Sequence, residues 1–149
     1  MNEPSPIEIL LVEDSPQDAE LTLRALRNAS LVNRIHLARD GVEALDFLFC
    51  EGPHATRRIE DAPKVVLLDL KLPRLDGLEV LRRLKGDPRT KAIPVVVLTS
   101  SREQNDVVAS YQLGVNSYIV KPVDFERFSA AVRELGLYWL LLNEPLRTL

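Results

Sequence analysis

KVVLLD at residues 64–69, followed by LKLPRLDG at residues 70–77, is the stretch that decides the fold expected for this chain. Residues 64–69 are almost entirely apolar before the final acid, which predicts a strand buried on both faces. Apolar residues at helical spacing follow Gly77, and Gly86-Asp87-Pro88 ends that pattern. A buried strand followed by an amphipathic helix is the repeating unit of a parallel α/β sheet.

The same unit recurs along the whole chain. Strands are expected at residues 7–12, 34–38, 64–69, 93–98 and 116–120, and helices at residues 16–28, 41–50, 78–85, 102–113 and 124–142. Ser15 is a good cap for the first helix and Pro16 a good first helical residue. Residues 51–63 are polar and predict a long surface loop, in which Arg57 and Arg58 are expected to be solvated charges. Five strands alternating with five helices predict an α/β fold, with helices on both faces of a parallel sheet.

The composition is that of one ordinary globular domain. The 149 residues are 46% hydrophobic and 28% charged, with a formal net charge of −3. This charge gives no support to a nucleic-acid partner. Cys50 is the only cysteine, so no internal disulfide is possible, and the apolar runs are too short for a signal peptide or a membrane span. We therefore expect a cytoplasmic protein with no membrane partner.

Polar side chains with chemical potential follow the predicted strands. They are Glu13 and Asp14 after the first strand, Asp69 at the end of the third, Thr99 after the fourth and Lys121 after the fifth. Right-handed crossovers bring the carboxyl ends of parallel strands to one edge of the sheet, where such sheets bind their ligands. We expect these five residues to meet there.

Three carboxylates at one edge repel one another unless a cation lies among them. Mg²⁺ prefers oxygen ligands and needs only one or two carboxylates, because it keeps several waters and also bridges to phosphates. Lys121 adds a positive charge and Thr99 a hydroxyl donor. This set of groups favours attack by a carboxylate on phosphorus, which gives an acyl phosphate.

Each of these residues also has an ordinary structural interpretation. Glu13-Asp14 could simply flank a helix, Asp69 could cap one, and Lys121-Pro122 could form a turn. Their joint position at one sheet edge favours the phosphoacceptor interpretation. Cys50 and the two histidines, His36 and His54, lack the spacing of metal ligands.

Four motifs carry a family resemblance. ILLVEDS at 9–15, VVLLDLKLPRLDG at 65–77, VVLTSS at 96–101 and YIVKP at 118–122 resemble the receiver domains of bacterial two-component response regulators. The likeness runs from about Ile7 to the last helix. It implies a flavodoxin-like (βα)5 sheet with strand order 2-1-3-4-5.

The resemblance also implies a role for each motif residue. Asp69 would be the phosphoacceptor, with a phosphohistidine on a sensor histidine kinase as donor. Mg²⁺ or Mn²⁺ would be bound directly by Asp14, Asp69 and the Lys71 backbone carbonyl, and through water by Glu13. Thr99 and Lys121 would contact the phosphoryl group, Tyr118 would be the switch aromatic together with Thr99, and the Lys121-Pro122 bond would be cis. Phosphotransfer and autodephosphorylation would be self-catalysed.

Three details resemble the small regulators that pair with phytochrome-type sensor kinases. They are Lys71 two residues after Asp69, the long loop before the third strand and the extended last helix. By this resemblance residues 1–149 form a single receiver domain with a tail over about 143–149. We therefore expect no output domain and signalling by protein contact.

The last predicted helix carries more apolar surface than one core face requires. Its core stripe consists of Phe128, Val132, Leu135, Trp139 and Leu142, while Tyr138 and Leu141 lie off that stripe. A helix apolar on nearly all sides needs a second partner surface. We therefore expect a homodimer through Tyr138, Trp139, Leu141 and Leu142; the alternative is that the helix folds back over its own domain.

Three other classes compete with a working receiver. A phosphohydrolase that forms an aspartyl phosphate needs an acid two residues after its nucleophile, where this chain has Lys71. A degenerate receiver that only binds partners would not need Asp14, Asp69, Thr99 and Lys121. A dinucleotide-binding module is disfavoured because no Gly-x-Gly-x-x-Gly follows the first strand.

Overall fold

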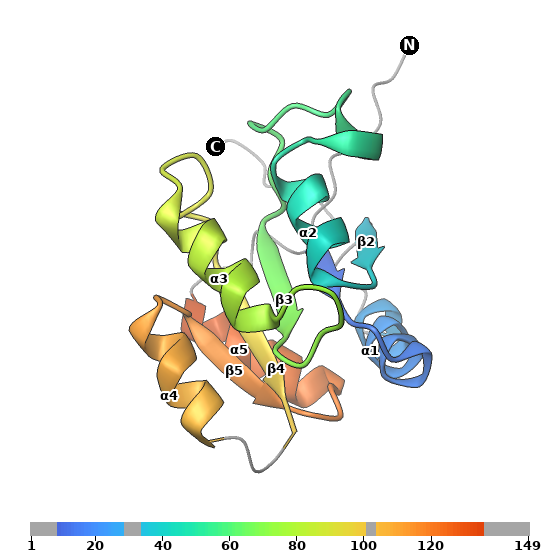
Figure 1. Cartoon of the computed structure of the whole chain (residues 1–149). Helices are drawn as coiled ribbons and strands as arrows, with labels where there is room; N and C mark the ends of the chain where they lie inside the picture. Colours follow the sequence, from blue (N-terminus) through green and yellow to red (C-terminus); the bar gives the residue numbers. More distant parts are fainter. Residues whose placement is uncertain (1–8, 29–33, 101–103, 136–149) are drawn as a thin grey trace, which may run out of the picture.

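A five-stranded parallel sheet forms the centre of the molecule (Figure 1). The computed structural model describes residues 9–28, 34–100 and 104–135 of the chain. The sheet order is β2-β1-β3-β4-β5, which confirms the predicted order 2-1-3-4-5. The strands are β1 (Ile9–Val12), β2 (Ile35–Ala38), β3 (Val65–Asp69), β4 (Val95–Thr99) and β5 (Ser117–Val120).

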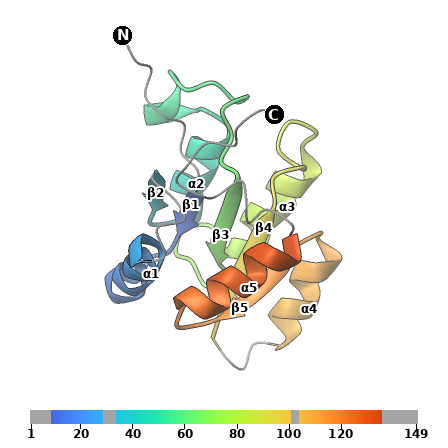
Figure 2. The same ribbon diagram turned by 180° about the vertical axis from the view of Figure 1, so that it is seen from behind.

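Helices cover both faces of this sheet, as Figures 1 and 2 show from opposite sides. They are α1 (Pro16–Asn28), α2 (Gly41–Leu48), α3 (Gly77–Gly86), α4 (Gln104–Gln112) and α5 (Phe125–Leu135), with a short 3-10 turn, η1 (Gly52–His54). Alternate strand residues point to opposite faces, so the sheet has two cores. Leu10 and Val66 pack with α2 and α3, whereas Leu11 and Val65 pack with Leu26 of α1 and with α5.

Polar side chains cap the starts of α1, α2 and α5, as the sequence predicted for Ser15. The hydroxyl of Ser15 accepts a hydrogen bond from the backbone N–H of Asp18 at 3.2 Å. Asp40 caps α2 by accepting from Glu43 N at 2.8 Å, and Asp124 accepts from Arg127 N at 2.8 Å. Local side-chain chemistry therefore sets where these helices begin.

Some boundaries differ from the sequence expectation. Helix α2 ends at Leu48 rather than Cys50, because Cys50 adopts a left-handed conformation with φ of 57°. β4 starts at Val95, since the ring of Pro94 cannot donate to the ladder. The structure describes α5 as far as Leu135, and residues 136–142 of the predicted helix lie outside the described residues.

The long loop is attached to the domain by Arg57. Its guanidinium lies 3.7 Å from the centre of the Phe47 ring and donates to the carbonyls of Phe47 and Asp61. On the same ring, His36 stacks at 4.3 Å between ring centres. The expectation that Arg57 is merely solvated is therefore wrong, because a cation–π contact and backbone acceptors hold it. Within the described residues, no helix is long and apolar enough to cross a bilayer.

Candidate functional site

Three carboxylates converge at the carboxyl edge of the sheet. Glu13 and Asp14 come directly after β1, and Asp69 is the last residue of β3. One oxygen of each carboxylate lies within 4.8 Å of the others. Asp14 is exposed, whereas Glu13 and Asp69 are buried. Hydrogen-bonded strand pairing produces this convergence, since Val12 of β1 is in register with Leu68 of β3.

Lys121 extends across the sheet edge from the end of β5 and supplies the opposite charge. Its Nζ is 2.8 Å from Glu13 Oε1 and 2.8 Å from Asp69 Oδ2. The carboxylate of Asp18 on α1 is the third ion-pair partner of Lys121 and lies 3.1 Å from the same nitrogen. The Lys121 side chain is 18% exposed, so these ion pairs are poorly screened.

Burial and these contacts shift two pKa values. Burial, together with the hydrogen bond to Asp69, raises the pKa of Glu13 to about 7, although Lys121 opposes the shift. Burial alone would lower the pKa of Lys121. The hydrogen bonds to Asp69 and Glu13 outweigh that effect, so the pKa of Lys121 lies above its ordinary value and the ammonium stays charged.

The turn after β3 is held close to the Asp69 carboxylate. Lys71 N donates to Asp69 Oδ1 at 3.0 Å, which places the backbone of Lys71 at the site. A Cβ on Gly77 would lie 2.5 Å from the carbonyl oxygen of Asp69, so the start of α3 packs directly on the acidic residue. Arg74, with φ of 67°, pairs with Asp40 at 3.1 Å and bridges this turn to the start of α2.

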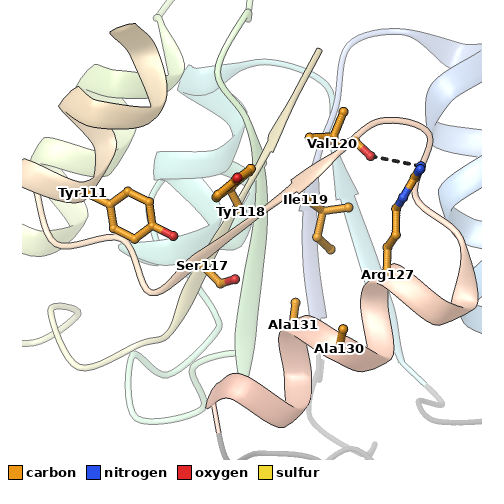
Figure 3. Close-up of a pocket in the computed structure, with 8 residues that line it drawn as sticks. All are labelled: Tyr111, Ser117, Tyr118, Ile119, Val120, Arg127, Ala130 and Ala131. Atoms are coloured by element: carbon orange, nitrogen blue, oxygen red, sulfur yellow. Dashed lines mark hydrogen bonds between the residues drawn. The ribbon is translucent and has the colours of Figure 1, made fainter. Parts of the chain in front are cut away.

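Thr99 and Tyr118 lie on neighbouring strands beside the cluster. Thr99 is buried, and its hydroxyl donates to the carbonyl of Ser100 at 3.0 Å. Lys121 N donates to Thr99 O at 2.8 Å, and the Lys121-Pro122 peptide is cis, as the resemblance implied. Tyr118 is 44% exposed and meets Tyr111 edge to face, with 6.3 Å between ring centres (Figure 3).

The structure thus brings together Glu13, Asp14, Asp69 and Lys121, as the sequence predicted. It adds Asp18, which the sequence reasoning missed. The available signal, the spacing Ser15-x-x-Asp18, indicated only a helix cap. The predicted dimer residues Tyr138, Trp139, Leu141 and Leu142 lie outside the described residues.

The donor set suits a hard divalent cation. It offers carboxylate oxygens on one partly open side, with a backbone turn and the Lys121 ammonium beside them. Mg²⁺ and Mn²⁺ prefer such oxygen ligands and keep open positions for water and phosphate. The two buried carboxylates would also gain charge compensation from the ion.

Comparison with known proteins assigns the family. The response regulator receiver domain profile matches residues 9–133. Probable methanogenesis regulatory protein FilR2 of Methanothrix harundinacea is 45% identical over 139 residues, which cover 93% of this chain and 86% of that protein. Response regulator Rcp1 of Synechocystis sp. is 40% identical over 135 residues, which cover 91% of this chain and 90% of that protein. The chain belongs to the response regulator receiver domain family.

Solved structures give the same result. The bacteriophytochrome response regulator AtBRR matches with a TM-score of 0.82 and 54% identity, covering 95% of this chain and all of that one, 100%. The Mn²⁺-bound form of Rcp1 matches with a TM-score of 0.74 and 38% identity, covering 96% of this chain and 100% of that chain. The phosphorylated cyanobacterial phytochrome response regulator RcpA matches with a TM-score of 0.74 and 40% identity, covering 91% of this chain and 94% of that chain.

The family assignment confirms the expected chemistry at the level of the domain. Receiver domains are phosphoacceptors and bind Mg²⁺ or Mn²⁺ at this acidic pocket. The family match favours a receiver domain over the phosphohydrolase alternative. The roles of individual residues remain predictions.

Proposed function

We propose that Asp69 of this chain accepts a phosphoryl group from a sensor histidine kinase. The observation that carries the proposal is the surroundings of its carboxylate. Lys121 Nζ lies 2.8 Å from Asp69 Oδ2, and Lys71 N lies 3.0 Å from Asp69 Oδ1. A nucleophile held by one cation and one backbone donor has the fixed position that phosphoryl transfer requires.

The proposed step is a displacement at phosphorus. A carboxylate oxygen of Asp69 forms the new O–P bond, while the N–P bond to the donor histidine breaks and its electron pair stays with the imidazole. Lys121 neutralises charge on the phosphoryl oxygens, and the Thr99 hydroxyl donates to one of them. Autodephosphorylation is the later attack of water on the same phosphorus.

Asp14, Asp69 and the backbone carbonyl of Lys71 would hold the divalent ion. It supplies charge neutralisation for the phosphoryl oxygens when it is bound. Glu13 acts through water, because its buried carboxylate is engaged by Lys121 and by Ser15 N at 3.2 Å. The exposure of Asp14 supports a direct role, since an open carboxylate is accessible to a hydrated ion.

Phosphorylation then shifts a population of conformations. Thr99 moves toward the phosphoryl group, and Tyr118 turns inward from its present exposed position. Support comes from the wide groove of about 550 Å³ beside Tyr118, which is lined by Tyr111, Ile119, Arg127 and Ala131 (Figure 3). Side chains there have room to rearrange.

The donor kinase is of the phytochrome type, and the chain works as a single receiver that signals by protein contact in the cytoplasm. AtBRR and RcpA support this pairing, because their names connect them with phytochromes. All of AtBRR, 100%, is covered by this chain. The formal net charge of −3 disfavours nucleic acid as the partner.

A homodimer forms through the last helix, with Tyr138, Trp139, Leu141 and Leu142 at the interface. Among the described residues, α4 offers exposed apolar side chains that a partner could cover: Val108 is 57% and Tyr111 is 46% exposed. Sedimentation of the full chain at high concentration should give a dimer mass. A monomer mass in both the unmodified and the phosphorylated protein would contradict the dimer.

Labelling with acetyl phosphate and Mg²⁺ tests the phosphoacceptor assignment. Asp69→Asn should take no label, and the label on the natural chain should be lost in acid or hydroxylamine, as for an acyl phosphate. Asp76→Asn is the matched control, because Asp76 is an exposed acid on the same turn. An acid-stable label, or one retained by Asp69→Asn, would rule Asp69 out. A natural chain that takes no label would favour the degenerate receiver.

A further inference from the structure

Asp18 is the third partner of the Lys121 ammonium. Its Oδ2 lies 3.1 Å from Nζ, beside Glu13 Oε1 at 2.8 Å and Asp69 Oδ2 at 2.8 Å. A lysine ammonium has three protons and no acceptor. Asp18 and Asp69 accept hydrogen bonds from this ammonium, and Glu13 completes the set as an ion-pair partner.

Asp18 is available for this contact because Glu13 replaces it in the helix cap. In a complete capping box the acid at this position would turn back to the N–H of Ser15. Only half of the box forms: Ser15 Oγ accepts from Asp18 N at 3.2 Å. Ser15 N donates instead to Glu13 Oε2 at 3.2 Å, which leaves the Asp18 carboxylate to pair with Lys121.

We infer that Asp18 is a positioning residue, which holds Lys121 at the site while Asp69 exchanges a carboxylate contact for a phosphoryl one. The inference rests on the proposed contact between Lys121 and the phosphoryl group. Lysine has a flexible four-carbon stem, so fixing its ammonium costs side-chain freedom. Because Asp18 lies outside the cluster of Glu13, Asp14 and Asp69, its contact does not compete for the divalent ion.

If Asp18 had only a structural role, its removal would lower the stability of the fold. The Asp18 side chain is 42% exposed, and ion pairs of that kind contribute little to stability. Loss of Asp18 should therefore leave the fold intact and change the behaviour of Lys121. The effect should appear in the rate of transfer rather than in binding of the phosphoryl donor.

The experiment compares Asp18→Ala with the natural chain and with Glu20→Ala. Glu20 is a matched control, because it is an exposed acid of the same helix that pairs with Arg24 at 3.2 Å. With acetyl phosphate and saturating Mg²⁺, Asp18→Ala should lower the maximal phosphorylation rate roughly fivefold and leave the half-saturating donor concentration nearly unchanged. Asp18→Glu should recover most of the rate, and Glu20→Ala should behave like the natural chain.

Nuclear magnetic resonance of the unphosphorylated protein gives a second readout. The ammonium protons of Lys121 should be protected from water exchange in the natural chain, and their signal should broaden in Asp18→Ala. An unchanged signal, or equal slowing by Glu20→Ala, would overturn the inference. Failure of the proposed function is distinct: Lys121→Ala would then be phosphorylated at the rate of the natural chain.

Discussion

Glu13 is a residue of the site whose buried carboxylate lowers the stability of the folded protein. Its side chain is 0% exposed, and it shares a small space with the carboxylate of Asp69. Burial of a charge costs free energy unless its partners compensate fully. The raised pKa of Glu13 reflects the cost of burying its charged form. It therefore predicts the direction in which the free energy of unfolding changes with pH.

Glu13→Gln should stabilise the metal-free protein at neutral and higher pH. The pKa of Glu13 is about 7 in the folded protein, against 4.5 as the ordinary value of a glutamate. Between these values the folded state keeps a proton that the unfolded state has lost, so the free energy of unfolding falls as pH rises and stays low above pH 7. The stabilisation should therefore be absent below the lower value and reach on the order of 1–3 kcal/mol above the higher one.

Chemical denaturation in the presence of a chelator at pH 4, 6 and 8 measures this difference. Glu20→Gln, on an exposed part of α1, is the control and should show no such pH trend. A difference that grows toward low pH would have the wrong sign and would contradict the assignment of the buried carboxyl.

At the scale of elements, the turn between β3 and α3 depends on close backbone contacts that the missing side chain of Gly77 allows. A Cβ on Gly77 would approach Asp69 O at 2.5 Å and Leu70 Cα at 2.6 Å. Both are backbone atoms that cannot rotate away. The start of α3 and the end of β3 are therefore in direct backbone contact, which couples helix position to the Asp69 carboxylate.

Gly77→Ala should lower stability by about 1–3 kcal/mol, because the added methyl group overpacks this contact. It should also weaken Mg²⁺ binding, since the backbone of Asp69 must shift. Gly86→Ala is the matched control on the same helix, with nothing within 4 Å of the added Cβ. It should be neutral or stabilising by up to about 1 kcal/mol. Thermal unfolding and calorimetric titration measure both effects, and equal behaviour of the two variants would contradict the contact.

The elements themselves were largely predictable from the sequence. Residues 65–69 form a buried strand that ends at Asp69, as expected, because continuous apolar runs are typical of strands covered on both faces in a parallel sheet. The contacts of Asp18 and Arg57 were not predictable. Both depend on side-chain directions and on partners that the chain brings near only after folding, and local patterns indicated a cap and a solvated charge.

At the scale of the whole molecule, the acidic cluster links metal binding to stability. An ion that binds only the folded state stabilises it in proportion to the logarithm of its concentration. Mg²⁺ at one hundred times its dissociation constant should therefore raise the free energy of unfolding by about 2.7 kcal/mol. Asp14→Asn should lose most of this gain, and sodium chloride of equal ionic strength should not reproduce it. An equal gain with the monovalent salt would indicate general screening.

The three-way pairing of Lys121 also concerns the order in which the protein is synthesised. Its partners on α1 and β3 precede it in sequence by 103 and 52 residues. The charge arrangement around Asp69 is therefore incomplete until the fifth strand has left the ribosome and joined the sheet. A nascent chain that exposes Asp69 early still lacks this ammonium group, so under the proposed role of Lys121 phosphoryl transfer requires the complete sheet.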